Sequence, residues 1–114
     1  MAERRHRVAR VITRLNIGGP AIQAINLSRQ LVPNGFDAVL LHGRLPDGEG
    51  DMTSLMPLDG IAARYQPHLV RPVSPLDDLR AFIALWRELR RCQPDIVHTH
   101  MAKAGSLGRL AAVL

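Results

Sequence analysis

The sequence predicts an α/β domain: a Rossmann-like parallel sheet flanked by helices. Short apolar segments alternate with longer segments whose apolar residues recur at helical spacing, which favours strands joined by crossover helices. One short segment is apolar from Ala38 to Leu41 without alternation, as is typical of a strand covered on both faces. A glycine pair, Gly18-Gly19, separates the first apolar segment from the first helix. The 114 residues suffice for one such domain.

The first half of the chain contains three predicted strands. We expect them over residues 7–13, 36–42 and 61–65, with a helix from Pro20 to Val32 and an exposed loop or short irregular helix over 43–60. The apolar stripe of this helix is Ala21, Ala24, Ile25, Ser28, Leu31 and Val32. The helix ends at Pro33-Asn34-Gly35 because this composition stops a helix.

The second half adds a helix, a strand and a helix. Ser74-Pro75 predicts a helix start, with Ser74 as the cap and Asp77 three positions later, and the helix runs to about Cys92. Its predicted buried stripe is Leu79, Phe82, Ile83, Trp86 and Leu89. A strand over 94–100 follows, and then a helix over 102–114 whose inner residues are Ala104, Leu107, Gly108 and Ala111.

Composition narrows the class of protein. The formal charge of +5 comes almost wholly from arginine, and aromatic residues make up only 4%, so we expect no nucleic-acid partner. The N-terminal arginines, or Arg87, Arg90 and Arg91, either contact an anionic membrane surface or form a solvated face. The single cysteine, Cys92, and the lack of a long apolar run favour a cytoplasmic protein.

The glycine pair is the first candidate binding element. Gly18 and Gly19 allow a ligand to approach the backbone, and the N–H groups of the following helix would face that ligand. Pro20 suits a first helical position because its missing N–H costs nothing there. The segment has neither the third glycine of the dinucleotide fingerprint nor the lysine of a P-loop. A phosphate site and a plain loop-to-helix turn both remain open.

Histidines end two of the predicted strands. His98 and His100 are two residues apart and therefore lie on one face of a strand, and His42 ends another strand. The pair could bind a polar ligand or phosphate, ligate a transition metal with His42, or be structural. No cysteine pair or nearby carboxylate completes a metal site, so we expect no metal and no other cofactor.

These polar features should meet at one edge of the sheet. Ligands of parallel α/β sheets bind beyond the carboxyl ends of the strands, so Gly18-Gly19, His42 and His98 to His100 should converge on one crevice. Lys103 and Gly105 begin the last helix, where amide groups and a cation favour an anion. An exposed first-turn lysine is the alternative interpretation.

Three motifs together resemble the amino-terminal domain of retaining glycosyltransferases of the GT-B architecture, specifically glycosyltransferase family 4. They are Val11 to Gly19, the helix Ala24 to Leu31, and Pro94 to His100 followed by Lys103-Ala104-Gly105 and Gly108-Arg109. The resemblance extends from Arg7 to the last residue. Pro20 departs from the small or polar residue that the family has after the glycine pair.

The resemblance implies half of an enzyme. Members of this family have two Rossmann-like domains facing a cleft, the first binding mainly the acceptor and the second the nucleotide-sugar donor. They move a sugar from a nucleotide-diphosphate donor to a lipid-linked or polysaccharide acceptor, with retention of configuration and usually without a divalent metal. Gly18 and Gly19 match the turn that faces the donor diphosphate and the transferred sugar. His98 to His100 match the strand end on the acceptor side.

The resemblance also implies what residues 1–114 leave out. We expect them to be a partial amino-terminal domain without the donor-binding domain and its paired glutamates, inactive and marginally stable alone. The parent protein is then a hexosyltransferase of polysaccharide biosynthesis, cytoplasmic or peripheral at the inner membrane face. The alternative is a stand-alone module that binds a nucleotide sugar or phosphate without catalysis.

Overall fold

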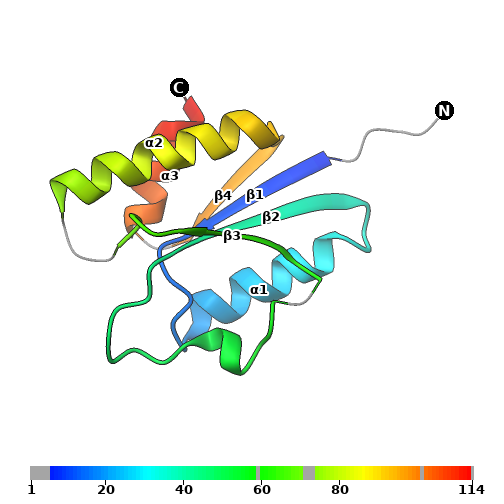
Figure 1. Cartoon of the computed structure of the whole chain (residues 1–114). Coiled ribbons are helices and arrows are strands. Elements are labelled where there is room, and N and C mark those ends of the chain that lie inside the picture. Colours follow the sequence, from blue (N-terminus) through cyan, green and yellow to red (C-terminus); the bar gives the residue numbers. More distant parts are fainter. Residues whose placement is uncertain (1–5, 59, 71–73, 101, 114) are drawn as a thin grey trace.

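In the computed structural model, helices cover both faces of one four-stranded sheet (Figure 1). The structure describes residues 6–58, 60–70, 74–100 and 102–113, with side chains for all of these except 102–104. The elements are β1 (His6–Ile12), α1 (Gly19–Leu31), β2 (Phe36–Gly43), η1 (Met52–Ser54), β3 (Ala62–Gln66), α2 (Pro75–Cys92), β4 (Ile96–His100) and α3 (Ala102–Val113). Each predicted strand and helix is present, with small shifts at its ends.

β1 lies in the interior of the sheet and pairs with a strand on each side. The strand order is β3-β2-β1-β4, and every pair is parallel. In this register Ile12 stands between His42 on β2 and His100 on β4. Parallel neighbours need crossover connections, which α1, the η1 segment and α2 provide. The predicted parallel α/β fold is confirmed.

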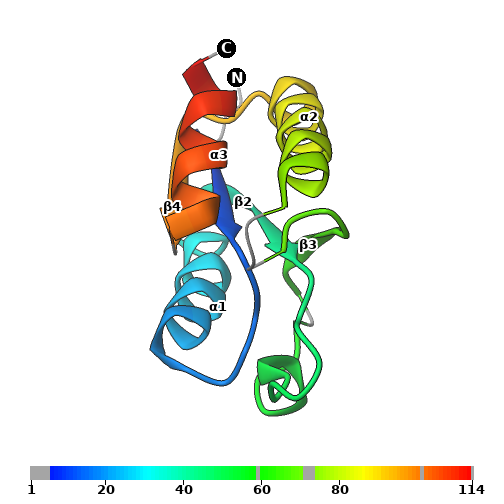
Figure 2. The ribbon, with the colours of Figure 1, turned by 90° about the vertical axis from the view of Figure 1, so that its left-hand side faces the viewer.

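Two apolar layers hold the helices to the sheet. Figures 1 and 2 show α2 and α3 on one face, and α1 with η1 on the other. The first layer is built from Ala9, Val11, Leu41, Leu69, Ala81, Leu85, Leu89 and Ala111. The second is built from Ile12, Leu15, Ala21, Ala24, Ile25, Leu40 and Met52. Because burying one leucine-sized side chain is worth about 1.5–3 kcal/mol, these layers dominate the stability of the fold.

The predicted stripe of α2 is wrong at two positions. Leu79 is 57% exposed and Ile83 is 39% exposed, so both point away from the sheet. The inward-facing residues are Ala81, Leu85 and Leu89, with Phe82 and Trp86 partly buried beside them. Two apolar arcs overlap on this helix, and the arc that faces the sheet contains the small Ala81, which permits close packing.

The other helix stripes follow the prediction more closely. The buried residues of α1 are Ala21, Ala24, Ile25 and Ser28, all of them expected. Val32, also expected in the stripe, lies beyond the helix and is 42% exposed. In α3, Gly108 and Ala111 are buried as predicted. A Cβ at Gly108 would stand 2.9 Å from Thr99 Cγ2, so the glycine lets α3 approach the sheet.

The predicted start of α2 is confirmed, but the capping of this helix differs from the prediction. The helix begins at Pro75, and Ser74 occupies the cap position without a side-chain bond to the backbone. Ser74 Oγ instead donates to Asp77 Oδ2 at 3.2 Å, while His68 Nδ1 lies 3.3 Å from Asp77 Oδ1. Hydrogen bonds from His68 and then Ser74 lower the pKa of Asp77.

The two connections at the carboxyl ends of β1 and β2 are bonded to each other. Ile17 N donates to Gly50 O at 3.1 Å, and Met52 N donates to Leu15 O at 2.9 Å. Met52, in η1, is 2% exposed and belongs to the α1-side layer. Of the two expected alternatives, an exposed loop or a short irregular helix, the structure shows a short helix, and its bonds fix the path of the chain toward Gly18-Gly19.

A glycine at the end of β2 allows two other segments to meet it. A Cβ at Gly43 would lie 2.2 Å from the carbonyl oxygens of both Leu69 and Thr13. We expect Gly43→Ala to lower the free energy of unfolding by about 3 kcal/mol or more, because backbone atoms must move. Urea unfolding of the natural full-length protein measures this. Gly19→Ala is the control, because no atom of the described residues lies within 4 Å of the added methyl group. Equal midpoints for the two variants would contradict the prediction.

Candidate functional site

Two histidines and an arginine lie together near the carboxyl ends of β1 and β4. Arg10 pairs in register with His98, and Ile12 with His100. Alternate residues of a strand share a face, so Arg10, His98 and His100 project from the face that α1 covers. The two imidazole centroids are 4.5 Å apart. The expectation that both histidines share one face is confirmed.

Arg10 is the polar centre of this cluster. It is only 4% exposed, although its side chain is charged. Its Nη1 lies 2.5 Å from His98 Nδ1 and 3.1 Å from His100 Nε2. The guanidinium has no acceptor atom, so it donates to both rings. Arg10 Nε is buried and has no hydrogen-bond partner among the described residues.

The electrostatics keep both imidazoles neutral. Burial, and then the charge of Arg10, lower the pKa of His98. The pKa of His100 is lowered to about 4. Burial is the largest cause of this shift, followed by the charges of His98 and Arg10. Burial lowers the pKa of Arg10, but a guanidinium remains protonated at physiological pH. No carboxylate among the described residues contributes to these shifts, so the cluster carries one positive charge.

His42 belongs to a different pocket. Its ring is 5.7 Å from that of Tyr65, and burial lowers its pKa while Asp51 opposes that shift. A pocket of about 550 Å³ at this end of β2 is lined by residues that include Leu15, His42, Arg44, Asp51 and Tyr65. In the described parts of the chain, no three histidine, cysteine or acidic side chains group as metal ligands would. β1 therefore separates His42 from the pair on β4.

The glycine pair stands at the start of α1, with open space beside it. Gly18 is extended and caps the helix without a side-chain bond, and its carbonyl oxygen accepts from Ile22 N at 3.1 Å. Within the described part of the chain, no atom lies within 4 Å of a Cβ built on Gly19, and one at Gly18 would only touch Pro20. A shallow depression beside Gly19 is lined by Pro20, Ile22, Gln23, Asn26 and Leu27. Neither backbone strain nor packing within the chain explains the pair.

The start of α3 gives less support to the prediction. The side chain of Lys103 lies outside the described residues, so its proposed anion contact stays a prediction. A Cβ at Gly105 would point to Thr99 Oγ1 at 3.7 Å, so this position faces β4. That direction indicates packing of α3 on the sheet.

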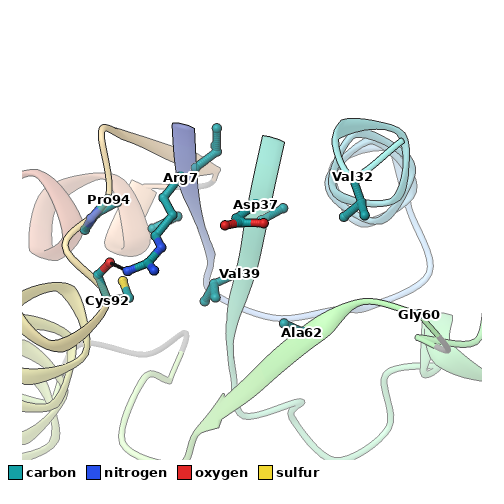
Figure 3. A pocket seen from close by; sticks show the side chains of 11 residues that line it. Arg7, Val32, Asp37, Val39, Gly60, Ala62, Cys92 and Pro94 are labelled. Carbon is teal, nitrogen blue, oxygen red and sulfur yellow. Dashed lines mark hydrogen bonds between the residues drawn. The ribbon is translucent and has the colours of Figure 1, made fainter. Parts of the chain in front are cut away.

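A second large pocket lies at the opposite end of the strands. Figure 3 shows its lining, with Arg7 and Asp37 at the amino ends of β1 and β2. Its volume is about 370 Å³, and Arg7 Nη1 donates across it to the carbonyl oxygen of Cys92 at 2.5 Å. Burial raises the pKa of the Cys92 thiol, which keeps it protonated. Since ligands of parallel sheets bind at carboxyl ends, this pocket is not the candidate site.

The sequence interpretation missed Arg10. It was one of several arginines around the first strand, and charge runs usually form solvated faces. Its position between Ala9 and Val11, inside an apolar strand, was the available signal. A charged residue in a strand covered on both faces indicates a buried partner, and the strand order then identifies His98.

Comparison with known proteins identifies the family of the chain. A model of Glycosyltransferase Family 4 matches residues 17–114, most of the chain. The chain belongs to glycosyltransferase family 4. Over 95 residues it is 36% identical to UDP-Gal:alpha-D-GlcNAc-diphosphoundecaprenol alpha-1,3-galactosyltransferase of Escherichia coli. Its structure is similar to that of MurG from Acinetobacter baumannii, with a TM-score of 0.70 and 18% identity.

This family 4 chain is short beside both proteins. The match covers 82% of the chain but 23% of the galactosyltransferase, and 95% of the chain but 32% of the MurG chain. The likeness to MurG concerns the fold and supports the Rossmann-like class within a GT-B architecture. The predicted family and fold class are confirmed.

The neutral state of His100 has a measurable consequence. Its pKa is about 4 in the folded protein, against about 6.5 for an unfolded histidine. Between these values the unfolded state binds more protons, so the contribution of His100 to stability falls as the pH drops from about 6.5 toward 4. Imidazole NMR titration measures the pKa of this residue directly. A His100 pKa near 6.5 would contradict the geometry.

Proposed function

We propose that this chain is the acceptor-side part of a glycosyltransferase that moves a hexose from a nucleotide-diphosphate donor to a lipid-linked or polysaccharide acceptor. Family membership carries the proposal. Two features of the sheet edge support it: the open helix N-terminus at Gly18-Gly19, and the histidine pair with Arg10. The donor base and much of the diphosphate would then bind to a second domain outside these 114 residues.

The residues have distinct roles in this proposal. The N–H groups of the first turn of α1 face the diphosphate or the transferred sugar, where the helix dipole favours negative charge. The missing Cβ of Gly19 leaves room for that group. His98 and His100 line the acceptor side, and the sugar is transferred with retention of configuration. No metal or other cofactor is required, because the helix terminus and Arg10 supply positive charge at this edge.

Turnover separates this proposal from a binding module without catalysis. The natural full-length protein is incubated with UDP-galactose and diphosphoundecaprenol-linked GlcNAc, the substrates that the name of the Escherichia coli relative states. Formation of a new glycosidic bond with this or another nucleotide hexose supports sugar transfer. Saturable binding of nucleotide sugars without product, across a panel of acceptors, would favour the binding module.

The glycine turn is tested by adding one methyl group. We expect Gly19→Ala to leave the unfolding midpoint unchanged, because none of the described residues occupies that space. Turnover should fall by roughly tenfold to a hundredfold, since a small displacement of a reacting group costs that much. The control is Gln30→Ala, an exposed change in the last turn of α1, away from this depression. Full activity in Gly19→Ala would remove the turn from the site.

We also propose that α2 contacts an anionic membrane surface, which fits a lipid-linked acceptor. Its exposed positions after Pro75 are Leu76, Leu79, Arg80, Ile83, Arg87, Arg90 and Arg91. This outer face is thus mainly aliphatic and basic, with the half-exposed Asp77 carboxylate in its first turn, and is similar to helices that lie on a bilayer. Figure 1 shows α2 as the outermost layer on its side of the sheet. No helix in the described part of the chain is long and apolar enough to span a bilayer.

Vesicle binding tests the outer face of α2. We expect Arg87→Gln/Arg91→Gln to weaken binding to phosphatidylglycerol vesicles by roughly thirty-fold, from about 1 kcal/mol per basic residue near the surface. Arg29→Gln/Arg44→Gln removes the same charge from exposed positions away from α2 and is the control. Equal losses in the two double variants, measured by co-sedimentation, would contradict a role for α2.

A further inference from the structure

The Arg10 cluster contains a buried cation to which no described residue supplies a counter-charge. Arg10 is 4% exposed, and among the described residues its hydrogen bonds go to the two imidazoles, while Nε has no partner. Burying an unpaired charge costs several kcal/mol in typical proteins. Neutral imidazoles offset only part of this cost, because they bring hydrogen-bond acceptors but no negative charge.

The same contacts fix which ring nitrogens carry hydrogen. Since Arg10 can only donate, His98 Nδ1 and His100 Nε2 must both accept. A neutral imidazole has one N–H, so His98 retains it on Nε2 and His100 on Nδ1. His98 is an exposed residue, and its remaining N–H is the one that a ligand at the strand end can reach.

We propose that Arg10 is a positioning residue that holds His98 and His100 as neutral single tautomers, so that the free Nε2–H of His98 donates to an oxyanion of the substrate. The oxyanion supplies the missing counter-charge, and the charge of Arg10 acts on it through the imidazoles. When one ring nitrogen of an imidazole accepts a hydrogen bond from a cation, the N–H on its second nitrogen becomes a stronger donor. That N–H then forms a stronger hydrogen bond to an anion. The identity of the oxyanion as a phosphate of donor or acceptor rests on the proposed function.

A purely structural role makes the opposite prediction for stability. A buried charge replaced by an apolar side chain of similar length often leaves a protein equally stable or more stable. If Arg10 serves the ligand, Arg10→Met keeps or raises the unfolding midpoint while anion binding is lost. If Arg10 serves the fold, the midpoint falls.

The first experiment needs no substitution. Imidazole ¹⁵N spectra of the natural full-length protein at neutral pH report which ring nitrogens are protonated. We expect unprotonated Nδ1 in His98 and unprotonated Nε2 in His100, each as one tautomer. A protonated His98 Nδ1, or a tautomer mixture in both rings, would overturn the proposal even if no variant folds.

The second experiment adds inorganic diphosphate as the probe. The His98 ring signals should shift saturably in the wild type, and the apparent affinity should fall about tenfold or more in Arg10→Met, whose rings should become tautomer mixtures. Arg10→Lys should restore much of the affinity because the charge remains. Arg109→Met, an exposed change on α3, is the control.

The His98 response to diphosphate decides between the outcomes. No His98 response to diphosphate in the wild type, or an unchanged response in Arg10→Met, would overturn the proposal. These spectra require no turnover, so failure of sugar transfer with an intact diphosphate response would refute the proposed function and leave this inference standing.

Discussion

The parallel pairing of β1 on both of its edges is the constraint on which the rest of the structure depends. Because β2 and β4 run in the same direction as β1, the carboxyl ends of all three meet at one edge. The register also fixes faces: Val11 joins the α2–α3 layer, while Arg10 and Ile12 point toward α1. A slip of one residue would place Arg10 among the helices of the other face. The strand register thus determines the geometry of the site.

Hydrogen bonds also join the connections beyond this edge to each other. Arg14 Nε donates to Glu49 Oε1 at 2.7 Å, beside the backbone bonds that join the β1–α1 and β2–η1 segments. Asp51 Oδ1 accepts from Thr53 N at 2.9 Å and thereby starts η1. The loop after β2, which is polar and glycine-rich, consequently braces the turn that leads to Gly18. A helix N-terminus in a fixed position can favour an anion without reorganisation when the ligand arrives.

The sequence was sufficient for the architecture because each strand carries its own signal. Uninterrupted apolar residues from Ala38 to Leu41 predict a strand covered on both faces, and the structure confirms this. The buried stripe of α2 was harder to predict from the sequence, since Leu79 and Leu85 lie on different apolar arcs of the helix. Only the tertiary packing determines which arc faces the sheet. The pairing of Arg10 with His98 depends on strand order, which no local pattern encodes. The separation of His42 from His100 has the same origin.

Two sources of positive charge lie at this edge, and their geometry gives them different roles. A helix N-terminus offers about half a unit charge that fades within the first turn, so α1 acts on groups touching Gly18-Gly19. Arg10 carries a full charge but is buried, so its effect must pass through His98 and His100. Protonating either ring would break its bond to Arg10 and place two cations in contact. The arrangement therefore disfavours the imidazolium form, so both histidines remain uncharged at neutral pH.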